Sequence, residues 1–234
     1  MEFIQQLNAL NISITNRQIE QFEVYYQRLI DTNKIMNLTA ITEKNDVYTK
    51  HFLDSVAIQA IMDMKNVNTV IDIGTGAGFP GLPLKIMFPH LHAVLLDSLE
   101  KRIRFLDAVT QELEVHHVTA IHGRAEEIAR KELYRESFDL VVSRAVSHLA
   151  TLAEYTLPFV KLDGHFISYK SGKIEDEIRE AQSAISILGG ELIHIKHITL
   201  PNTDIERSFV IIKKTKNTND KYPRRAGKPE KYPL

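Results

Sequence analysis

Residues 70–81, VIDIGTGAGFPG, are the strongest indication of the fold of this chain. Residues 69–73 are a short, apolar, β-branched run that predicts a strand, and residues 82–88 predict a helix. Four glycines lie in the eight residues from Gly74 to Gly81 that join the two. Glycine lets a backbone turn tightly and approach a ligand closely, because it has no Cβ. The stretch therefore predicts a strand–turn–helix unit with a ligand at the carboxyl end of the strand.

Two classes of ligand fit these glycines. The spacing Gly76-x-Gly78-x-x-Gly81 matches the dinucleotide pattern GxGxxG, which alone is a weak signal. The spacing Asp72-x-Gly74-x-Gly76-x-Gly78 is the form of the methionine-binding loop of S-adenosylmethionine (AdoMet) enzymes, and it describes the segment better. AdoMet has no pyrophosphate and needs open backbone beside its sulfonium, with polar contacts for its ammonium and carboxylate. A tight turn without a ligand is the third alternative, which so many glycines disfavour.

Beyond the glycines, runs that predict strands alternate with runs that predict helices. Such β–α–β connections produce a parallel sheet with helices on both faces. Two last strands with only a loop between them predict an antiparallel pair added to that sheet. The fold class is therefore α/β, with a mostly parallel, seven-stranded, Rossmann-like sheet flanked by helices. The predicted strands are residues 69–73, 92–96, 118–121, 138–143, 164–169, 192–198 and 209–213, and the helices after the glycine turn are residues 82–88, 99–112, 124–131, 149–160 and 173–188.

The chain divides into three parts. Its 234 residues, 44% of them hydrophobic, are enough for one sizeable core. Residues 65–214 carry the α/β pattern and form the predicted AdoMet-binding domain. Residues 1–64 show helical periodicity at 16–34 and 46–63, and we expect them to pack on that domain as a helical extension. Residues 215–234 form a basic tail.

The tail differs from the rest of the chain in charge. The formal net charge of the whole chain is −1, yet residues 213–234 hold eight Lys and Arg against one Asp and one Glu. Three prolines and a glycine in this segment predict that it forms no regular element. Such a tail is suited to contacts with phosphate groups, and a solubilising terminus is the alternative. The acidic remainder of the chain indicates that any RNA is met by local patches.

The composition argues against cysteine-dependent chemistry, a metal site and a membrane span. The chain has no cysteine, which excludes disulfides, Cys-ligated zinc, iron–sulfur clusters and a cysteine nucleophile. Its ten histidines show no spacing typical of metal ligands, so no metal is expected. No apolar run approaches the roughly 18–20 residues of a membrane span. The first residues do not read as a signal peptide, and we expect a cytoplasmic protein without membrane contact.

Three further polar residues follow predicted strands. Asp97 ends the second strand and can accept both ribose hydroxyls of a nucleoside, in NAD as well as in AdoMet. Glu126 can accept an adenine amine, or it is a first-turn acid favoured by the helix dipole. Arg144 follows the fourth strand and can hold a guanine oxygen or a phosphate, with an ion pair to a helix carboxylate as the alternative.

The end of the fourth strand also narrows the reaction. It offers Ser143 and Arg144 and lacks the Asn/Asp-Pro-Pro-aromatic signature of enzymes that methylate exocyclic amines. Without cysteine, covalent activation of a pyrimidine ring is excluded. What remains is a nucleophile that needs little activation. Guanine N7 is one, because its lone pair is exposed and no proton has to leave, so that transfer depends mainly on position and alignment.

Motifs spread over almost the whole chain resemble one family. They are DIGTGAGFPGLPLKI (72–86), LLDSLEKRIRFL (95–106), GRAEE (123–127), VVSRAV (141–146), NLTAIT (37–42), KHFLDS (50–55) and the tail KYPRRAGKPEKYPL (221–234). Together they closely resemble the bacterial 16S rRNA guanine-N7 methyltransferase family, RsmG or GidB. The resemblance implies a Rossmann-like class I methyltransferase with an N-terminal helical extension. It implies AdoMet-dependent methylation of N7 of one guanine, position 527 of 16S rRNA, within the small ribosomal subunit.

The resemblance also implies the site residues. Expected cofactor contacts are Gly74, Gly76, Gly78, Phe79, Asp97, Ser98, Leu99, Ala125, Glu126 and Arg144, and Arg144 is also the expected catalytic residue. Candidate RNA contacts are Arg144, Lys170, His51, Lys101, Arg102, Arg104, Arg224 and Arg225, while Tyr222 and Tyr232 either stack on bases or pack in the tail. Ser171 interrupts the family's usual Lys-Gly pair, which leaves the role of Lys170 open. The protein is expected to be a monomer.

Three alternatives to an rRNA methyltransferase remain from the sequence. A small-molecule methyltransferase differs in its acceptor, and the basic tail disfavours it slightly. A nicotinamide-dependent oxidoreductase could use the same glycine turn, but no substrate domain follows the sheet. A non-catalytic RNA-binding module could retain a vestigial cofactor fold, although Asp72, the glycines and Asp97 are all intact.

Overall fold

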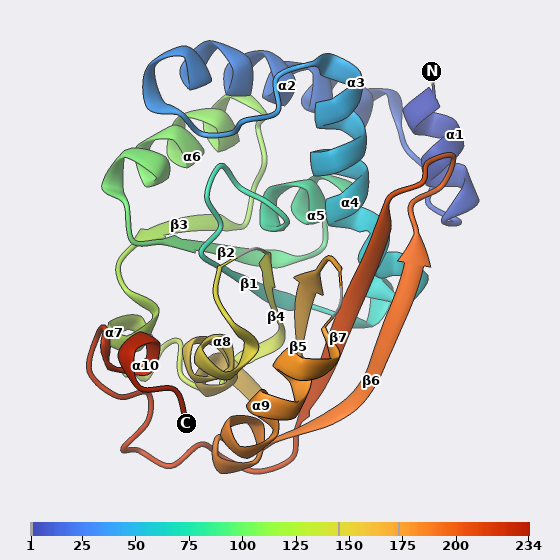
Figure 1. Cartoon of the computed structure of the whole chain (residues 1–234). Coiled ribbons are helices and arrows are strands. Elements are labelled where there is room, and N and C mark those ends of the chain that lie inside the picture. Colours follow the sequence, from blue (N-terminus) through green and yellow to red (C-terminus); the bar gives the residue numbers. More distant parts are fainter. Residues whose placement is uncertain (1, 145, 173) are drawn as a thin grey trace.

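A seven-stranded sheet runs through the computed structural model, which describes residues 2–144, 146–172 and 174–234 (Figure 1). Strands β1 to β5 run parallel, β7 is antiparallel to β5, and β6 is antiparallel to β7. The strand order is β3-β2-β1-β4-β5-β7-β6. This topology confirms the predicted fold class and the closing antiparallel pair. The strands are β1 (Thr69–Ile73), β2 (His92–Asp97), β3 (Val118–His122), β4 (Phe138–Arg144), β5 (Val160–Lys170), β6 (Gly190–Thr199) and β7 (Glu206–Lys214).

Helices cover both faces of this sheet (Figure 1). The α-helices are α1 (Glu2–Ala9), α2 (Asn16–Met36), α3 (Lys44–Val47), α4 (Asp54–Val56), α5 (Gly81–Met87), α6 (Glu100–Glu112), α7 (Ala125–Ile128), α8 (Leu149–Thr156), α9 (Glu175–Ile187) and α10 (Lys228–Lys231). Shorter windings of other pitch are η1 (Tyr48–Leu53), η2 (Ala57–Ala60), η3 (Met64–Asn66) and η4 (Leu157–Phe159). The N-terminal helices, α5 and α6 pack on one face, and α8 and α9 pack on the other.

The alternation of side chains along the strands builds the two apolar layers. In β1, Val70 joins the layer of the N-terminal helices, and its neighbour Ile71 joins the layer of α8 and α9. In β7, Phe209 and Val210 divide in the same way. Successive residues of a strand point to opposite faces, so a sheet buried on both faces needs continuous apolar runs.

The N-terminal helices are positioned by local and distant contacts. Helix α2 begins with a capping box, in which the Thr15 side chain accepts a hydrogen bond from the Gln18 backbone and the Gln18 side chain accepts one from the Thr15 backbone. Three buried aromatic rings then join these helices to the sheet. They are Phe3, Phe22 and Phe52, which lie in the apolar layer that also contains Val70 of β1. Helix α1 was not predicted from the sequence.

The helical periodicity predicted over residues 46–63 corresponds to helical windings from Lys44 to Ala60, and these are not one regular α-helix. The winding changes from α3 to the π-helical η1, back to α4, and then to the 3-10 helix η2. Apolar periodicity cannot distinguish these windings, because all of them bury one face. Lys50 and His51 lie on the π-helical η1 and Asp54 begins α4, and all three contact Arg144. Single π-helical turns are frequent at functional sites.

The prediction that the tail forms no regular element is incorrect at its end, where α10 forms. The tail is held by the core rather than extended into solvent. The Arg224 guanidinium forms an ion pair with Glu154, whose carboxylate is fully buried on α8. Tyr222 is buried in the layer of α8 and α9. These are long-range contacts, which proline content and net charge do not reveal.

Three residues carry predictions that the structure does not describe. Residue 1 of the helical extension, residue 145 of the motif at 141–146, and residue 173 of the predicted helix at 173–188 lie outside the described residues. Among the described residues, no helix is long and apolar enough to cross a membrane.

Candidate functional site

The glycine turn lies at the carboxyl end of β1, beside the point where the chain order of the sheet reverses between β1 and β4. Gly76 has φ +62°, and a Cβ placed there would meet nothing within 4 Å. Its backbone therefore faces open space in a conformation that side chains disfavour. At Gly81 the reason for glycine is packing, because a Cβ would lie 2.4 Å from the Leu95 side chain.

The Asp72 side chain connects the two ends of this turn through hydrogen bonds. Its Oδ2 accepts hydrogen bonds from the Thr75 hydroxyl at 2.7 Å and from the Gly81 backbone at 2.8 Å. Burial raises the pKa of the Asp72 carboxyl to about 6, against the opposing effect of these two hydrogen bonds. Its side chain is fully buried, so the acid of the predicted loop pattern holds the loop in shape.

Asp97 links the turn to the end of β2. Its Oδ2 accepts a hydrogen bond from the Gly76 backbone at 2.9 Å, and its Oδ1 accepts one from the Leu99 backbone at 2.9 Å. The Arg102 guanidinium pairs with the same carboxylate at 3.1 Å. Asp97 is thus held in place by two backbone donors, and Arg102 is its ion-pair partner.

Asp97 also lines a small pocket at the ends of β1, β2 and β3. This small pocket is lined by Ile73, Gly74, Leu96, Asp97, Ser98, Gly123, Arg124, Ala125, Glu126, Val146 and Tyr155. It brings together the carboxylate predicted to hold a ribose and the residues predicted to flank an adenine. Gly74 lines this pocket and the larger one described below, so the two adjoin at the glycine turn.

The tail reaches the small pocket from the far end of the chain. The Gly227 backbone donates a hydrogen bond to Glu126 Oε1 at 3.1 Å. The Thr151 hydroxyl donates one to the carbonyl of Pro229 at 3.2 Å, which fixes the next part of the tail on α8. One oxygen of the predicted adenine-binding carboxylate is therefore held by the tail, which leaves Oε2 for a ligand.

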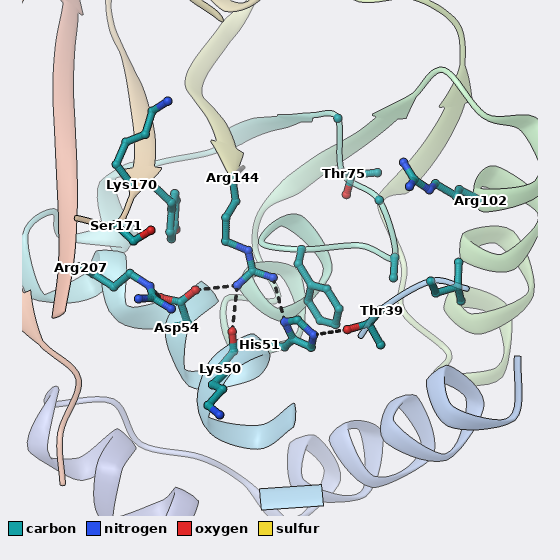
Figure 2. A pocket seen from close by; sticks show the side chains of 16 residues that line it. Thr39, Lys50, His51, Asp54, Thr75, Arg102, Arg144, Lys170, Ser171 and Arg207 are labelled. Carbon is teal, nitrogen blue, oxygen red and sulfur yellow. Dashed lines mark hydrogen bonds and ion pairs between the residues drawn. The ribbon is translucent and has the colours of Figure 1, made fainter. Parts of the chain in front are cut away.

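A larger pocket of about 470 Å³ opens on the other side of the turn (Figure 2). The glycine turn forms one side of it. The N-terminal extension contributes Thr39, His51 and Asp54, and the ends of β5 and β7 contribute Ser171 and Arg207. Arg144 extends from β4 into the middle of this large pocket (Figure 2).

Arg144 is held on several sides. Its Nη1 donates to Asp54 Oδ2 at 2.7 Å and to the carbonyl of Lys50 at 3.4 Å. Its Nη2 lies 3.3 Å from His51 Nδ1. Its guanidinium carbon lies 5.1 Å from the centroid of the Phe79 ring, within the range of a cation–π contact. The ion pair proposed as the alternative role of Arg144 is present, and it fixes the guanidinium within the pocket.

His51 is neutral at physiological pH. Burial and the nearby Arg144 charge lower the pKa of its imidazole to about 4. Because a guanidinium only donates hydrogen bonds, Nδ1 accepts from Arg144 and Nε2 carries the proton. Nε2 then donates to the Thr39 hydroxyl at 2.8 Å. The ring stacks on Phe79, with centroids 4.5 Å apart and planes 14° apart.

The structure gathers most of the predicted site residues. The large pocket is lined by Gly74, Gly76, Phe79 and Arg144, and by the RNA-contact candidates His51, Arg102 and Lys170. The small pocket collects Asp97, Ser98, Ala125 and Glu126. Leu99, beside Asp97, keeps 42% of its surface exposed.

Other predicted residues lie elsewhere. Gly78 lines neither pocket, and a Cβ there would lie 2.5 Å from the Tyr25 hydroxyl oxygen, so its role is packing. Arg224 binds Glu154, and Tyr222 is buried, which is at odds with RNA contact by these two side chains. Lys101 and Arg104 line a separate groove between α2 and α6.

Sequence reasoning gave no site role to several residues of the large pocket, among them four that contact Arg144, His51 or Asp54. They are Thr39, Lys50, Asp54 and Arg207. The first three lie in the motifs at 37–42 and 50–55, from which only His51 was given a role. No sequence signal pointed to Arg207. Among the described residues, no group of three or more His, Asp or Glu is placed to hold a metal ion.

Comparison with known proteins identifies one family. A family model described as GidB, rRNA small subunit methyltransferase G, matches residues 18–209. A protein of Lachnoclostridium phytofermentans called ribosomal RNA small subunit methyltransferase G is 53% identical over 99% of this chain and 96% of its own length. Its namesake in Bacillus subtilis is 46% identical over 100% of this chain and 98% of its own length.

Solved structures of lower identity share the fold. M. jannaschii TYW2 in complex with AdoMet has a TM-score of 0.54 at 16% identity, over 79% of each chain. A mutant of MtNAS in complex with S-adenosylmethionine has a TM-score of 0.56 at 16% identity, over 86% of this chain and 72% of the other. These similarities confirm the architecture of the sheet and its helices.

Proposed function

This chain belongs to the rRNA small subunit methyltransferase G family, and we propose that it transfers a methyl group from AdoMet to N7 of one guanine in small-subunit rRNA. One observation carries the proposal. The open backbone of the glycine turn and the guanidinium of Arg144 line the same pocket, so a methyl donor on the turn and a base held by Arg144 share one space. By the resemblance noted above, the target is the guanine at position 527 of 16S rRNA.

The residues around the turn fit AdoMet. The space beside Gly76 would be filled by any Cβ and is open to a ligand. Asp97 offers a preorganised carboxylate for the ribose hydroxyls, and Glu126 offers Oε2 for the adenine amine. Ser98 and Ala125 line the same small pocket, and the Leu99 backbone donates to Asp97. When bound, AdoMet supplies the methyl group on its sulfonium.

The pocket residues favour guanine N7 as the acceptor atom. Arg144 presents a cation held in place by Asp54, and a guanidinium is a good partner for guanine O6. The lone pair of His51 Nδ1 accepts from Arg144 and the pKa of the imidazole is lowered to about 4, so His51 does not act as a general base toward the acceptor. N7 needs no base, because its lone pair attacks directly. The protein's contribution is then alignment of the two reactants.

The partner that follows from the family is 16S rRNA within the small ribosomal subunit. We propose a cytoplasmic monomer without membrane contact, and we keep the division into an extension at 1–64, an AdoMet-binding domain at 65–214 and a tail at 215–234. The family's chemistry favours this function over the oxidoreductase and over the RNA-binding module. Methylation of a small molecule is the remaining alternative. The experiment below distinguishes a small-molecule acceptor from rRNA.

The test is methyl transfer from labelled AdoMet to three competing acceptors. These are small ribosomal subunits that lack the modification, naked 16S rRNA, and a metabolite extract. Chain cleavage selective for N7-methylguanine then maps the product. A Gly76→Val variant serves as the inactive control, because a β-branched side chain is strained at φ +62° and projects into the cofactor space.

We expect label at a single guanine of the subunit, and none with the variant. Label confined to metabolites would overturn the rRNA assignment and leave the cofactor site standing. Label in rRNA that resists N7-selective cleavage would overturn the choice of acceptor atom.

A further inference from the structure

One buried carboxylate in the large pocket is shared by two arginines. Asp54, 1% exposed in its side chain, accepts from Arg144 Nη1 at 2.7 Å through Oδ2 and from Arg207 Nε at 2.6 Å through Oδ1. Both guanidiniums carry a full charge at any physiological pH. One positive charge at this place is therefore left without a carboxylate among the described residues.

The other cations of the pocket are different. Lys50 pairs with Asp46 at 2.9 Å, Arg102 with Asp97 at 3.1 Å, and Lys170 with Glu177 at 2.5 Å. Each has a carboxylate of its own. The surplus of positive charge in the pocket is thus localised at the Asp54 cluster, meaning Asp54 with Arg144 and Arg207.

Of the two arginines, Arg207 has more N–H groups without a partner among the described residues. Arg144 uses both N–H groups of Nη1 for Asp54 and the carbonyl of Lys50 and one N–H of Nη2 for His51, which leaves its Nε and the second N–H of Nη2 for the base. Arg207 uses Nε for Asp54 and Nη1 for the carbonyl of Glu206, which leaves Nη2 without a partner in the described part of the chain. Its side chain is 20% exposed, so that edge is accessible.

Arg207 lies on the wall of the pocket that faces away from the glycine turn. In Figure 2 it lies beside Asp54, with the Ser171 hydroxyl near it, while Thr75 and Arg102 lie on the opposite side of Arg144. The pairing of Lys170 with Ser208 in the sheet explains this, because it places the end of β5 beside Arg207. A ligand on the glycine turn and a ligand at Arg207 would approach Arg144 from opposite sides.

We propose that Arg207 and the Ser171 hydroxyl form a phosphate subsite for the backbone of the acceptor nucleotide. The inference rests on the proposed function and adds to it a reason for RNA over a free base. A partly buried guanidinium with a surplus charge favours an anion, and phosphate accepts charge-assisted hydrogen bonds from Arg and from a hydroxyl. The carboxylate of AdoMet is the wrong anion by position, since the glycine turn lies across the pocket.

The test compares acceptor fragments that differ in one phosphate. Guanosine, guanosine 5′-monophosphate and guanosine 3′-monophosphate are used as competitive inhibitors of methyl transfer to small subunits. For the unsubstituted protein we expect one of the monophosphates to inhibit about tenfold or more tightly than guanosine, as a charged hydrogen bond typically gives. With Arg207→Gln this preference should fall to about one, while AdoMet affinity stays unchanged.

The salt dependence of subunit binding is a second readout. If Arg207 had only a structural role, its substitution would leave this dependence unchanged. Loss of one phosphate contact should reduce the slope of log affinity for the subunit against log salt concentration by about 0.7. Arg17→Gln is the matched control, because Arg17 is an exposed, carboxylate-paired arginine outside both pockets. It should change neither the slope nor the preference for phosphate. Arg207→Lys, which keeps the charge, should retain part of the preference.

Several outcomes would overturn the proposal. One is an equal affinity of the unsubstituted protein for guanosine and for both monophosphates, which decides the matter even if Arg207→Gln does not fold. Another is a folded Arg207→Gln variant with an unchanged preference and slope. If the protein transfers no methyl group to rRNA, monophosphate binding is measured directly by calorimetry; tighter binding that depends on Arg207 then leaves the phosphate subsite standing while the proposed function fails.

Discussion

The carboxylate of Asp54 lies 2.7 Å from Nη1 of Arg144, across 90 residues of chain. It joins the N-terminal extension to the end of β4, at the middle of the large pocket. Since Arg144 is 15% exposed and Asp54 1% exposed in their side chains, the pair is largely desolvated. The extension is therefore part of the site, because it supplies the group that holds the central arginine in place.

Asp54→Asn removes the countercharge of two arginines at nearly constant shape. Breaking one side of a buried ion pair typically costs about 3 kcal/mol, because the remaining charge is uncompensated. We expect a loss of that order in the free energy of unfolding, measured in urea, and a methylation rate at least tenfold lower. Asp46→Asn is the control, because the exposed Asp46–Lys50 pair should contribute about 0–1 kcal/mol. Equal effects of the two substitutions would contradict the assignment.

Asp97→Asn tests the cofactor carboxylate. The amide keeps the shape but loses charge and acceptor strength toward the ribose hydroxyls, so AdoMet affinity should fall about tenfold or more. Binding by calorimetry measures it. Asp139→Asn is the matched control, since Asp139 accepts from the backbone of Asn68 and Thr69 at the amino ends of β1 and β4, away from the pockets. It should lower stability without changing AdoMet affinity.

His51 should make folding depend on pH. Its pKa is about 4 in the folded protein and 6.5 in an unfolded chain, so the folded state binds fewer protons between these values. The free energy of unfolding therefore rises with pH from about 4 to 6.5, and this contribution is lost again as pH falls. The shift corresponds to about 3 kcal/mol.

The measurement is the difference between unsubstituted protein and His51→Gln, taken in urea at several pH values. The difference is needed because Asp72 acts in the opposite direction. Its pKa is raised from 3.8 to about 6, so its contribution falls as pH rises through that range. A difference curve that is flat between pH 4 and 6.5 would show that His51 titrates normally.

Methyl transfer itself should not depend on pH above about pH 7. Attack by N7 releases no proton from the base, and His51 and Asp72 both titrate below this range. Single-turnover rates with saturating AdoMet and subunits should thus be constant between about pH 7 and 9. A rate that climbs tenfold per pH unit would indicate removal of a proton and would point to a different acceptor atom.

Arg224 tests the tail as part of the cofactor site. Arg224→Ala leaves Glu154 buried and unpaired, which should cost about 3 kcal/mol of stability. Release of the tail also frees Glu126 from Gly227, so AdoMet affinity should drop. Arg225→Ala, an exposed neighbour, should change stability by no more than about 0.5 kcal/mol and leave AdoMet binding intact. Unchanged AdoMet affinity of a folded Arg224→Ala protein would refute this role of the tail.

Local patterns accounted for the sheet, the glycine turn and the polar residues at strand ends. Those features are encoded within a few residues, because strand alternation, glycine backbone freedom and strand-end position are local properties. The cofactor contacts at Asp97, Ser98, Ala125 and Glu126 stay predictions, although the structure places them together around one pocket. The changes of winding within residues 46–63 were not predicted, because apolar periodicity does not encode them.

Sequence patterns alone were enough to predict the α/β fold class, the position of the glycine turn and, through the motifs, the family. Three features required the folded chain: the two arginines that pair with Asp54, the neutral state of His51, and the path of the tail. Arg207 reaches Asp54 across 153 residues, and Gly227 reaches Glu126 across 101. Such pairings depend on how strands and helices stack after the chain has folded, since side chains far apart in sequence meet only when the apolar layers close. Their charges and pKa values then follow from burial, which no single stretch of sequence specifies.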